Sequence, residues 1–237
     1  MEAVILAGGR GVRLRPYTTR LPKPLVPIGN DHAILEIVLC QLAQQGFRKV
    51  TLAIGHFGHL IRSFVGDGQR WGLEIAYVNE FTPLGTLGPV VGARDALPEH
   101  FVVMNGDVLT DVDTMRLLDT HVASGAPLTV GTYCRQEQID LGVVEVEDGR
   151  IVDFVEKPTY DYRVSMGVYA VSREALAGYP VGEPLGFDRF ILDLVRQGSR
   201  AAEFVHDGYW LDIGRPDDYD RANEEFGRMR GALLRGA

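Results

Sequence analysis

The stretch Ala3-Val4-Ile5-Leu6-Ala7-Gly8-Gly9-Arg10-Gly11, close to the start of the chain, decides the fold. A short apolar run that ends in glycines is typical of a buried strand followed by a glycine loop. Apolar runs of strand length recur at 49–54, 73–77 and 101–104, and helical patterns at 33–45, 59–65 and 89–97 alternate with them. Because strands separated by helices are joined by right-handed crossovers, the sequence predicts a mostly parallel sheet that is covered on both faces.

The second half of the chain has a different pattern. Apolar runs at 143–146 and 151–155 flank Asp148-Gly149, which predicts a β-hairpin. We expect a further strand at 166–171, an amphipathic helix at 187–196 and a polar closing helix at 217–229. The fold class is therefore α/β, one Rossmann-like domain with a mixed sheet and a smaller antiparallel lobe. Lobes of this kind commonly roof a pocket at the carboxyl ends of the parallel strands.

Composition excludes several classes of protein. The 237 residues are 46 % hydrophobic and 24 % charged, ordinary values for a globular protein with a full core. A formal net charge of −8 argues against nucleic acid as a partner. No segment approaches the roughly 20 apolar residues of a membrane span, and an acidic residue stands where a signal peptide needs positive charge. Two cysteines, Cys40 and Cys134, fit a reducing, cytoplasmic location and form no disulfide framework.

The glycine loop favours phosphate binding. Gly8, Gly9 and Gly11 leave backbone N–H groups free to converge on an anion, and Arg13 and Arg15 add positive charge. The dinucleotide fingerprint fails because it needs a further glycine, and the P-loop fails because no Gly-Lys-Ser/Thr is present. The alternative is a tight strand-to-helix turn with solvated arginines.

Three further residues are ambiguous when taken singly. Lys23 lies between two prolines in a rigid, extended segment, but alone it is better explained as a surface lysine. Asp107 follows an apolar run and so belongs at the carboxyl end of a strand, unless Asn-Gly-Asp is a plain turn. Asp212 also follows an apolar run, and its alternative role is to cap a helix before Arg215.

The segment from Gly8 to Pro27 resembles the signature of the sugar-1-phosphate nucleotidylyltransferases, Gly-Gly-x-Gly-x-Arg-Leu-x-Pro followed by a Thr and then Pro-Lys-Pro. Further motifs follow in the order of that family: Pro83-Leu84-Gly85-Thr86, Asn105-Gly106-Asp107, Glu156-Lys157-Pro158 and Trp210-Leu211-Asp212-Ile213-Gly214. The resemblance implies a GT-A-like nucleotidyltransferase domain over residues 1–237. Its nucleotide-binding half would cover about 1–135, and its sugar-binding half with the closing helix 136–237.

The reaction that this resemblance implies is transfer of a nucleoside monophosphate from an NTP to a sugar 1-phosphate, with release of pyrophosphate and a requirement for Mg²⁺. A phosphate monoester with a second pKa near 6 is already ionised at neutral pH, so no general base is needed. Catalysis then depends on positioning and on cations. The histidines lack metal or triad spacing, and structural roles are favoured for His56, His59 and His121.

The resemblance also assigns residues to each part of the site. Catalysis falls to Arg13, Lys23, Asp107 and Asp212, and the two aspartates hold the metal ion. The residues assigned to the nucleotide are Leu6, Ala7, Gly8, Gly9, Gly11, Arg13, Glu80, Gly88 and Asp107. Those assigned to the sugar phosphate are Gly142, Glu156, Lys157 and Ser165. Glu156 and Lys157 can serve one ligand only if Pro158 breaks the strand pleat, since neighbours in a strand point to opposite faces.

Several points stay open at this level. Gly85-Thr86-Leu87-Gly88-Pro89, Leu141 and Ser165 depart from the usual family pattern, which leaves the base and the sugar unassigned. We favour GTP with mannose or heptose 1-phosphate, and dTTP, UTP or CTP with glucose or another sugar 1-phosphate is the alternative. Rival classes are a glycosyltransferase using Asp111-Val112-Asp113, better explained as a helix N-cap, and a non-catalytic nucleotide-sugar sensor. The oligomeric state is open, with a homodimer among the alternatives.

Overall fold

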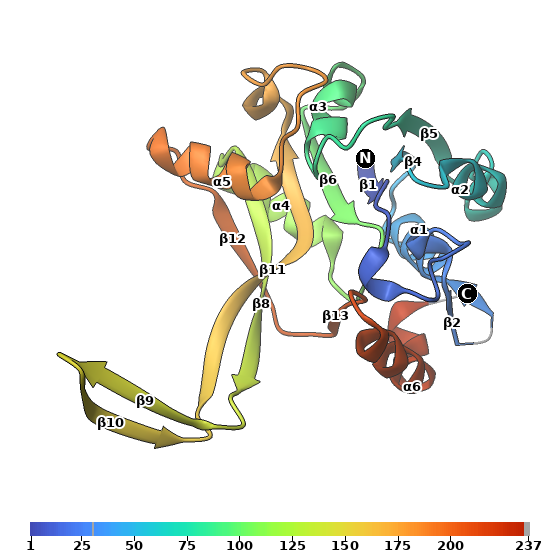
Figure 1. Ribbon diagram of the computed structural model, residues 1–237. Coiled ribbons are helices and arrows are strands. Elements are labelled where there is room, and N and C mark those ends of the chain that lie inside the picture. Colours follow the sequence, from blue (N-terminus) through green and yellow to red (C-terminus); the bar gives the residue numbers. More distant parts are fainter. Residues whose placement is uncertain (30, 235–237) are drawn as a thin grey trace.

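A seven-stranded sheet forms the centre of the computed structural model, which describes residues 1–29 and 31–234 (Figure 1). The strand order is β12-β8-β11-β6-β1-β4-β5. Only β11 is antiparallel to its neighbours in this sheet, and every other adjacent pair is parallel, which confirms the mixed, mostly parallel sheet. The strands are β1 (Glu2–Ala7), β4 (Lys49–Ile54), β5 (Glu74–Asn79), β6 (His100–Asn105), β8 (Leu128–Gln138), β11 (Thr159–Ser172) and β12 (Ala202–His206).

Helices cover both faces of the sheet. One face packs against α1 (Ile34–Gln44), α2 (Gly58–Val65) and α4 (Thr114–Ser124), and the other against α3 (Gly88–Ala93) and α5 (Phe187–Arg196). Two fully buried cores result, because the strands of a sheet covered on both faces must be apolar on both sides. The expected helix at 89–97 is α3 followed by a 3₁₀ turn, Arg94–Ala96. No helix among the residues described is both long and apolar enough to span a bilayer.

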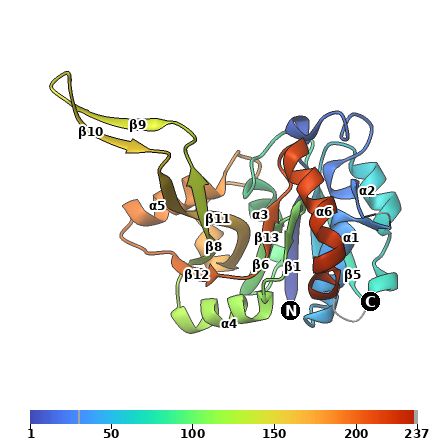
Figure 2. The same cartoon turned by 90° about the horizontal axis from the view of Figure 1, so that it is seen from below.

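A third cluster of buried residues ties the closing helix to the glycine loop. Helix α6 (Pro216–Leu233) lies beside α1 (Figure 2) and contributes Ala222 and Phe226 to this cluster. Leu14, from the 3₁₀ turn Val12–Leu14 after the glycine loop, is fully buried in the same cluster. Short strands complete this side of the molecule: β2 (Pro27–Ile28), β3 (His32–Ala33), β7 (Val108–Thr110) and β13 (Trp210–Asp212).

The predicted hairpin forms, but it does not lie where we expected. Strands β9 (Gly142–Glu147) and β10 (Arg150–Glu156) pair across Asp148-Gly149, whose φ angles of 48° and 75° suit a two-residue turn. The distal halves of β8 and β11 continue beyond the sheet as a two-stranded ribbon, with this hairpin at its end (Figures 1 and 2). We call residues 134–163 the arm, because Thr132 and Tyr133 still pair with β12 in the main sheet. The arm projects away from the body, so the expectation that this lobe roofs the pocket is wrong.

His121 is a structural residue, and it gives the fold a pH dependence. Its ring is fully buried, with Nδ1 2.9 Å from Thr129 Oγ1 and Nε2 3.0 Å from Ser172 Oγ. Burial, together with the nearby His100, lowers the pKa of His121 to about 4. The unfolded chain binds this proton near pH 6.5, so the stabilising contribution is complete above that pH and is lost as the pH falls towards 4.

Urea unfolding should therefore show a free energy that falls by up to about 3 kcal/mol between pH 6.5 and pH 4. We expect His121→Gln to remove most of this dependence, whereas the exposed His59→Gln should keep it. An unchanged slope in His121→Gln would assign the effect to other groups.

Candidate active site

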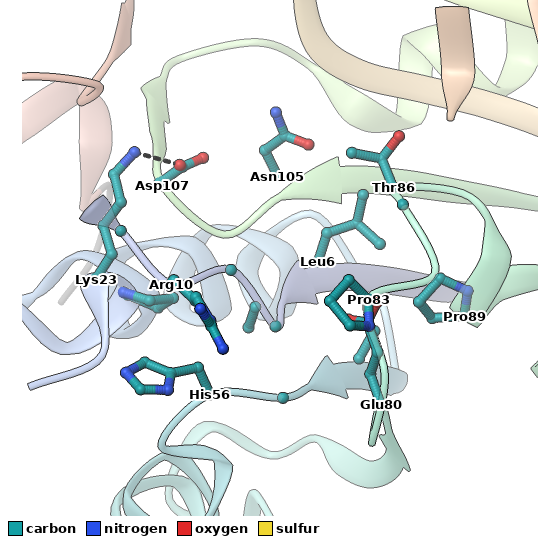
Figure 3. Close-up of a pocket in the computed structure, with 18 of the residues that line it drawn as sticks. Leu6, Arg10, Lys23, His56, Glu80, Pro83, Thr86, Pro89, Asn105 and Asp107 are labelled. Carbon is teal, nitrogen blue, oxygen red and sulfur yellow. Dashed lines mark hydrogen bonds and ion pairs between the residues drawn. The ribbon is translucent and has the colours of Figure 1, made fainter. Parts of the chain in front are cut away.

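A cleft of about 860 Å³ opens where four neighbouring strands end (Figure 3). Each strand contributes the residues that follow it. Gly8 and Gly9 follow β1, Gly55 and His56 follow β4, Glu80 and Phe81 follow β5, and Asp107 follows β6. The carboxyl edge of a parallel sheet is the usual place for a ligand in an open α/β fold.

The glycine loop is held in shape by backbone packing and by one threonine. Gly8 and Gly55 touch so closely that a Cβ on Gly55 would lie 2.8 Å from the Gly8 carbonyl oxygen. Gly11 has a left-handed φ of 60°, and Thr18 Oγ1 donates a hydrogen bond of 2.7 Å to the Gly11 carbonyl oxygen. These positions need glycine for steric reasons, and the loop presents its backbone to the cleft.

Lys23 lies inside the cleft and not on the surface. It begins the 3₁₀ turn Lys23–Leu25, is only 7 % exposed, and forms an ion pair with Asp107 (Figure 3). The prolines on both sides restrict the backbone around Lys23. The interpretation of Lys23 alone as a surface lysine is thus wrong, and the cleft holds a buried ammonium group beside a carboxylate.

Asp107 and Asp212 come together although 104 residues separate them in the chain. Strand β13 pairs with β7, which places Asp212 opposite Val108, and the Ile213 N–H donates a hydrogen bond of 3.2 Å to the Asp107 carbonyl oxygen. Burial raises the pKa of Asp212 and the charge of Asp107 raises it further, while Lys23 and Arg13 act in the opposite direction. The four groups therefore share one electrostatic environment.

The carboxyl oxygens of Asp107 and Asp212 are the hard donors that a cation such as Mg²⁺ prefers. Among residues 1–29 and 31–234, no cluster of three or more His, Cys, Asp or Glu side chains could hold a metal ion. An ion held by two aspartates would have to complete its coordination with water and phosphate oxygens. The raised pKa of Asp212 fits this arrangement, because a divalent cation would relieve the repulsion between the carboxylates.

Most of the residues predicted for the nucleotide line the cleft. They are Leu6, Ala7, Gly8, Gly9, Gly11, Arg13, Glu80 and Asp107. Gly88 does not line it. Its backbone packs instead at the start of α3, where its N–H donates a hydrogen bond of 3.1 Å to the Leu185 carbonyl oxygen.

The residues predicted for the sugar phosphate lie apart from the cleft. Gly142, Glu156 and Lys157 are exposed on the arm, and Lys157 Nζ is 2.7 Å from Asp140 Oδ1. Strand β10 ends at Glu156 and Lys157 has a left-handed φ of 47°, so the pleat is broken just before Pro158. Ser165 lies at the base of the arm, where its Oγ donates a hydrogen bond of 2.9 Å to Tyr169 Oη.

Sequence reasoning missed several residues of the cleft, among them Arg10, Gly55, His56, Thr86 and Asn105. Gly55 and His56 directly follow the strand expected at 49–54, so the rule that pointed to Asp107 could have found them too. His59 and His121 lie outside this cleft.

The Asp-Val-Asp string has structural roles. Asp113 caps α4, since its Oδ1 accepts a hydrogen bond of 2.9 Å from the Arg116 N–H. Asp111 Oδ1 accepts a hydrogen bond of 2.7 Å from the Tyr209 N–H. Neither aspartate lines the cleft, so this string offers no support for a glycosyltransferase.

The fold and the site define a class: an α/β protein whose glycine loop, cationic side chains and paired aspartates are suited to handling phosphate groups. The family model described as Nucleotidyl transferase matches residues 2–228. The chain belongs to the nucleotidyl transferase family, and the resemblance found in its sequence motifs is confirmed.

Named relatives agree with this assignment. The chain is 34 % identical to D-glycero-alpha-D-manno-heptose 1-phosphate guanylyltransferase of Aneurinibacillus thermoaerophilus, an alignment that covers 95 % of this chain and 98 % of the relative. It is 32 % identical to mannose-1-phosphate guanylyltransferase of Mycobacterium tuberculosis, over 96 % of this chain but only 65 % of that protein. The crystal structure of HddC from Yersinia pseudotuberculosis complexed with GMP-PN matches with a TM-score of 0.73 and 25 % identity, over 95 % of this chain and 99 % of that one.

Proposed function

We propose that this chain transfers GMP from GTP to heptose or mannose 1-phosphate and releases pyrophosphate in a Mg²⁺-dependent reaction in the cytoplasm. One observation carries the proposal. A single cleft gathers the glycine loop, Arg13, Lys23 and Asp107, and Asp212 lies near enough to these three charged side chains for them to shift its pKa. The same four side chains argue against a non-catalytic sensor, which would have no need to keep all of them together.

The chemistry requires two polyanions to meet. The sugar phosphate is ionised at neutral pH and attacks the α-phosphorus in line, so the protein must position the reactants and offset their charge. In this proposal the glycine loop N–H groups and Arg13 bind the triphosphate and stabilise the leaving pyrophosphate, and Lys23 orients phosphate oxygens at the reacting centre. Mg²⁺ held by Asp107 and Asp212 would supply a concentrated positive charge there.

Glu80 supports guanine as the base. One of its carboxyl oxygens accepts a hydrogen bond from the Leu84 N–H, and the other faces Gly8 at the cleft wall. A carboxylate only accepts hydrogen bonds. Guanine offers it two adjacent donors, whereas uracil and thymine place their single ring donor between two acceptors. The guanylyltransferase relatives point in the same direction.

Replacing Glu80 by glutamine should weaken selection of guanine. The glutamine side chain would place its own N–H donors against the N–H donors of guanine. We therefore expect kcat/KM for GTP to fall by about 10- to 100-fold, which corresponds to the free energy of one hydrogen bond to a charged group. The values for UTP and dTTP should fall less. Glu74→Gln, at an exposed position on β5, the strand that Glu80 follows, is the matched control and should leave kcat/KM for every nucleotide unchanged. An equal loss for all nucleotides would remove Glu80 from base recognition.

The substrate proposal is tested by measuring pyrophosphate release with each NTP against several sugar 1-phosphates. GTP with heptose or mannose 1-phosphate should give the highest kcat/KM. UTP with glucose 1-phosphate is the main alternative, since a uridylyltransferase of Synechocystis is also 34 % identical over 99 % of this chain. Preference for that pair would correct the substrates and keep the reaction, whereas no pyrophosphate release with any pair would overturn the function.

A further inference from the structure

One face of the hairpin on the arm is apolar and open to water. Register pairs Val146 with Ile151 and Val144 with Phe154, and directly paired residues share a face. These four side chains are 46–69 % exposed. Folded monomers rarely leave a contiguous apolar patch of this kind uncovered, and an isolated two-stranded hairpin is marginally stable in water. We therefore expect a second protein surface to cover this apolar face of the hairpin.

A continuous ladder holds the arm in a course that projects away from the body of its own chain (Figures 1 and 2). Every residue from Thr159 to Ser165 pairs in continuous register with the segment from Gln138 to Thr132. A ribbon of that length extends about 20 Å. Gly142, Glu156 and Lys157 lie at its far end, so a cleft that meets them belongs to another molecule.

The junction between ribbon and hairpin has features of a functional element. We call residues 140–142 and 156–158 the elbow. Lys157 adopts a left-handed φ of 47°, which is costly for a residue with a side chain and is often kept at functional sites. A Cβ on Gly142 would lie 2.3 Å from Phe154 Cζ and 3.2 Å from Glu156 Oε2, so a larger residue there would have to displace the exposed Phe154 ring.

Charge favours a second copy of this chain as the occupant. The arm carries eight Asp and Glu residues against four Lys and Arg. In the cleft Lys23 is paired with Asp107 and Glu80 is a further carboxylate, but Arg10 and Arg13 are exposed. Each copy thus has an acidic arm and two exposed arginines at its cleft. Opposite charge on the two surfaces guides such an encounter and fixes its register.

We propose that two copies of this chain form a symmetric dimer in which the arm of each copy lies across the cleft of the other. The elbow of one copy then supplies Glu156 and Lys157 to the sugar 1-phosphate bound in its partner. This inference rests on the proposed function and on the family resemblance, which assigns these two residues to that substrate. A twofold axis makes the exchange reciprocal, so both sites are completed at once.

Solution mass tests the interface without reference to activity. Sedimentation of the full chain at micromolar concentration should give a dimer. Val146→Lys places a charge on the apolar face of the arm and should give a monomer. Val122→Lys on α4, where the native side chain is 52 % exposed compared with 55 % for Val146, should remain a dimer. A wild-type chain that is monomeric yet fully active would overturn the proposal.

Complementation tests whether the arm works on the partner. The Asp107→Asn variant has a functional arm but a defective cleft. The Lys157→Ala variant has a functional cleft but a defective elbow. We expect each variant alone to be nearly inactive. Random pairing puts half of the chains in mixed dimers with one intact site each, so co-expression should restore about a quarter of the wild-type activity.

No restoration, with the wild type active and both variants folded by circular dichroism, would show that each arm serves its own cleft and would overturn the exchange. A wild type that is dimeric but releases no pyrophosphate would instead contradict the proposed function. The two failures are therefore distinguishable.

Discussion

Asp212→Asn is expected to lower kcat at saturating Mg²⁺ by about 10³-fold, in line with the loss of a preorganised group that acts on developing charge. The amide keeps the shape of the side chain but removes one of the two negative charges proposed to hold the ion. Binding of Mn²⁺, followed by electron paramagnetic resonance without substrate, should weaken in parallel. Asp220→Asn, at an exposed position on α6, is the control and should leave both quantities unchanged.

The folded state itself should tolerate this substitution. The pKa of Asp212 is raised, chiefly by burial, so its ionised form destabilises the fold at neutral pH. This loss of folding free energy is absent below the ordinary aspartate pKa and complete above the raised pKa of Asp212. It is therefore present at pH 7. Thermal unfolding with a chelator should show Asp212→Asn to be at least as stable as the wild type. A clearly lower Tm would attribute the lost activity to unfolding, and near-normal turnover would remove Asp212 from the metal site.

The parallel part of the fold could be predicted because its signals are local. The strand expected at 49–54 and the helix expected at 187–196 form with those bounds. Alternation of strands and helices then determines the sheet, and the carboxyl ends of its strands locate the cleft. The glycine loop was found for the same reason, since its three glycines lie within four positions.

Features that depend on distant pairing could not be found in this way. Strands β7 and β13 have three residues each, too short for a periodic signal, yet their pairing brings Asp212 to Asp107. The resemblance to a family, and not periodicity, put those aspartates in one site. Strand β11 begins at Thr159, earlier than the start expected at 166. Tyr160 and Tyr162 alternate with polar residues in this segment, which is a strand signal, but the expected strand covered only the apolar run that follows, and pairing with β8 shows the true start.

The charge of Lys23 explains why the cleft keeps two carboxylates close together before any substrate binds. Its ammonium group forms an ion pair with Asp107 and partly offsets the rise in the pKa of Asp212, so it partly takes the role that a divalent cation would have. Lys23 therefore has two expected effects of opposite sign. Lys23 competes with the metal ion for the aspartates. Once the metal ion has displaced it from them, Lys23 is free to bind substrate phosphate.

Lys23→Gln should separate these effects. We expect kcat/KM to fall by about 10²- to 10³-fold, because a cation that positions phosphate oxygens is lost. Affinity for Mn²⁺ in the free protein should rise several-fold, because the two carboxylates no longer have the ammonium group as a competitor. Lys49→Gln is the matched control, since Lys49 Nζ also pairs with a carboxylate, 3.3 Å from Glu2 Oε1, but lies outside the cleft. A purely structural Lys23 would instead lower stability and Mn²⁺ affinity together and leave kcat of the folded fraction intact, and that result would contradict its place in the reaction.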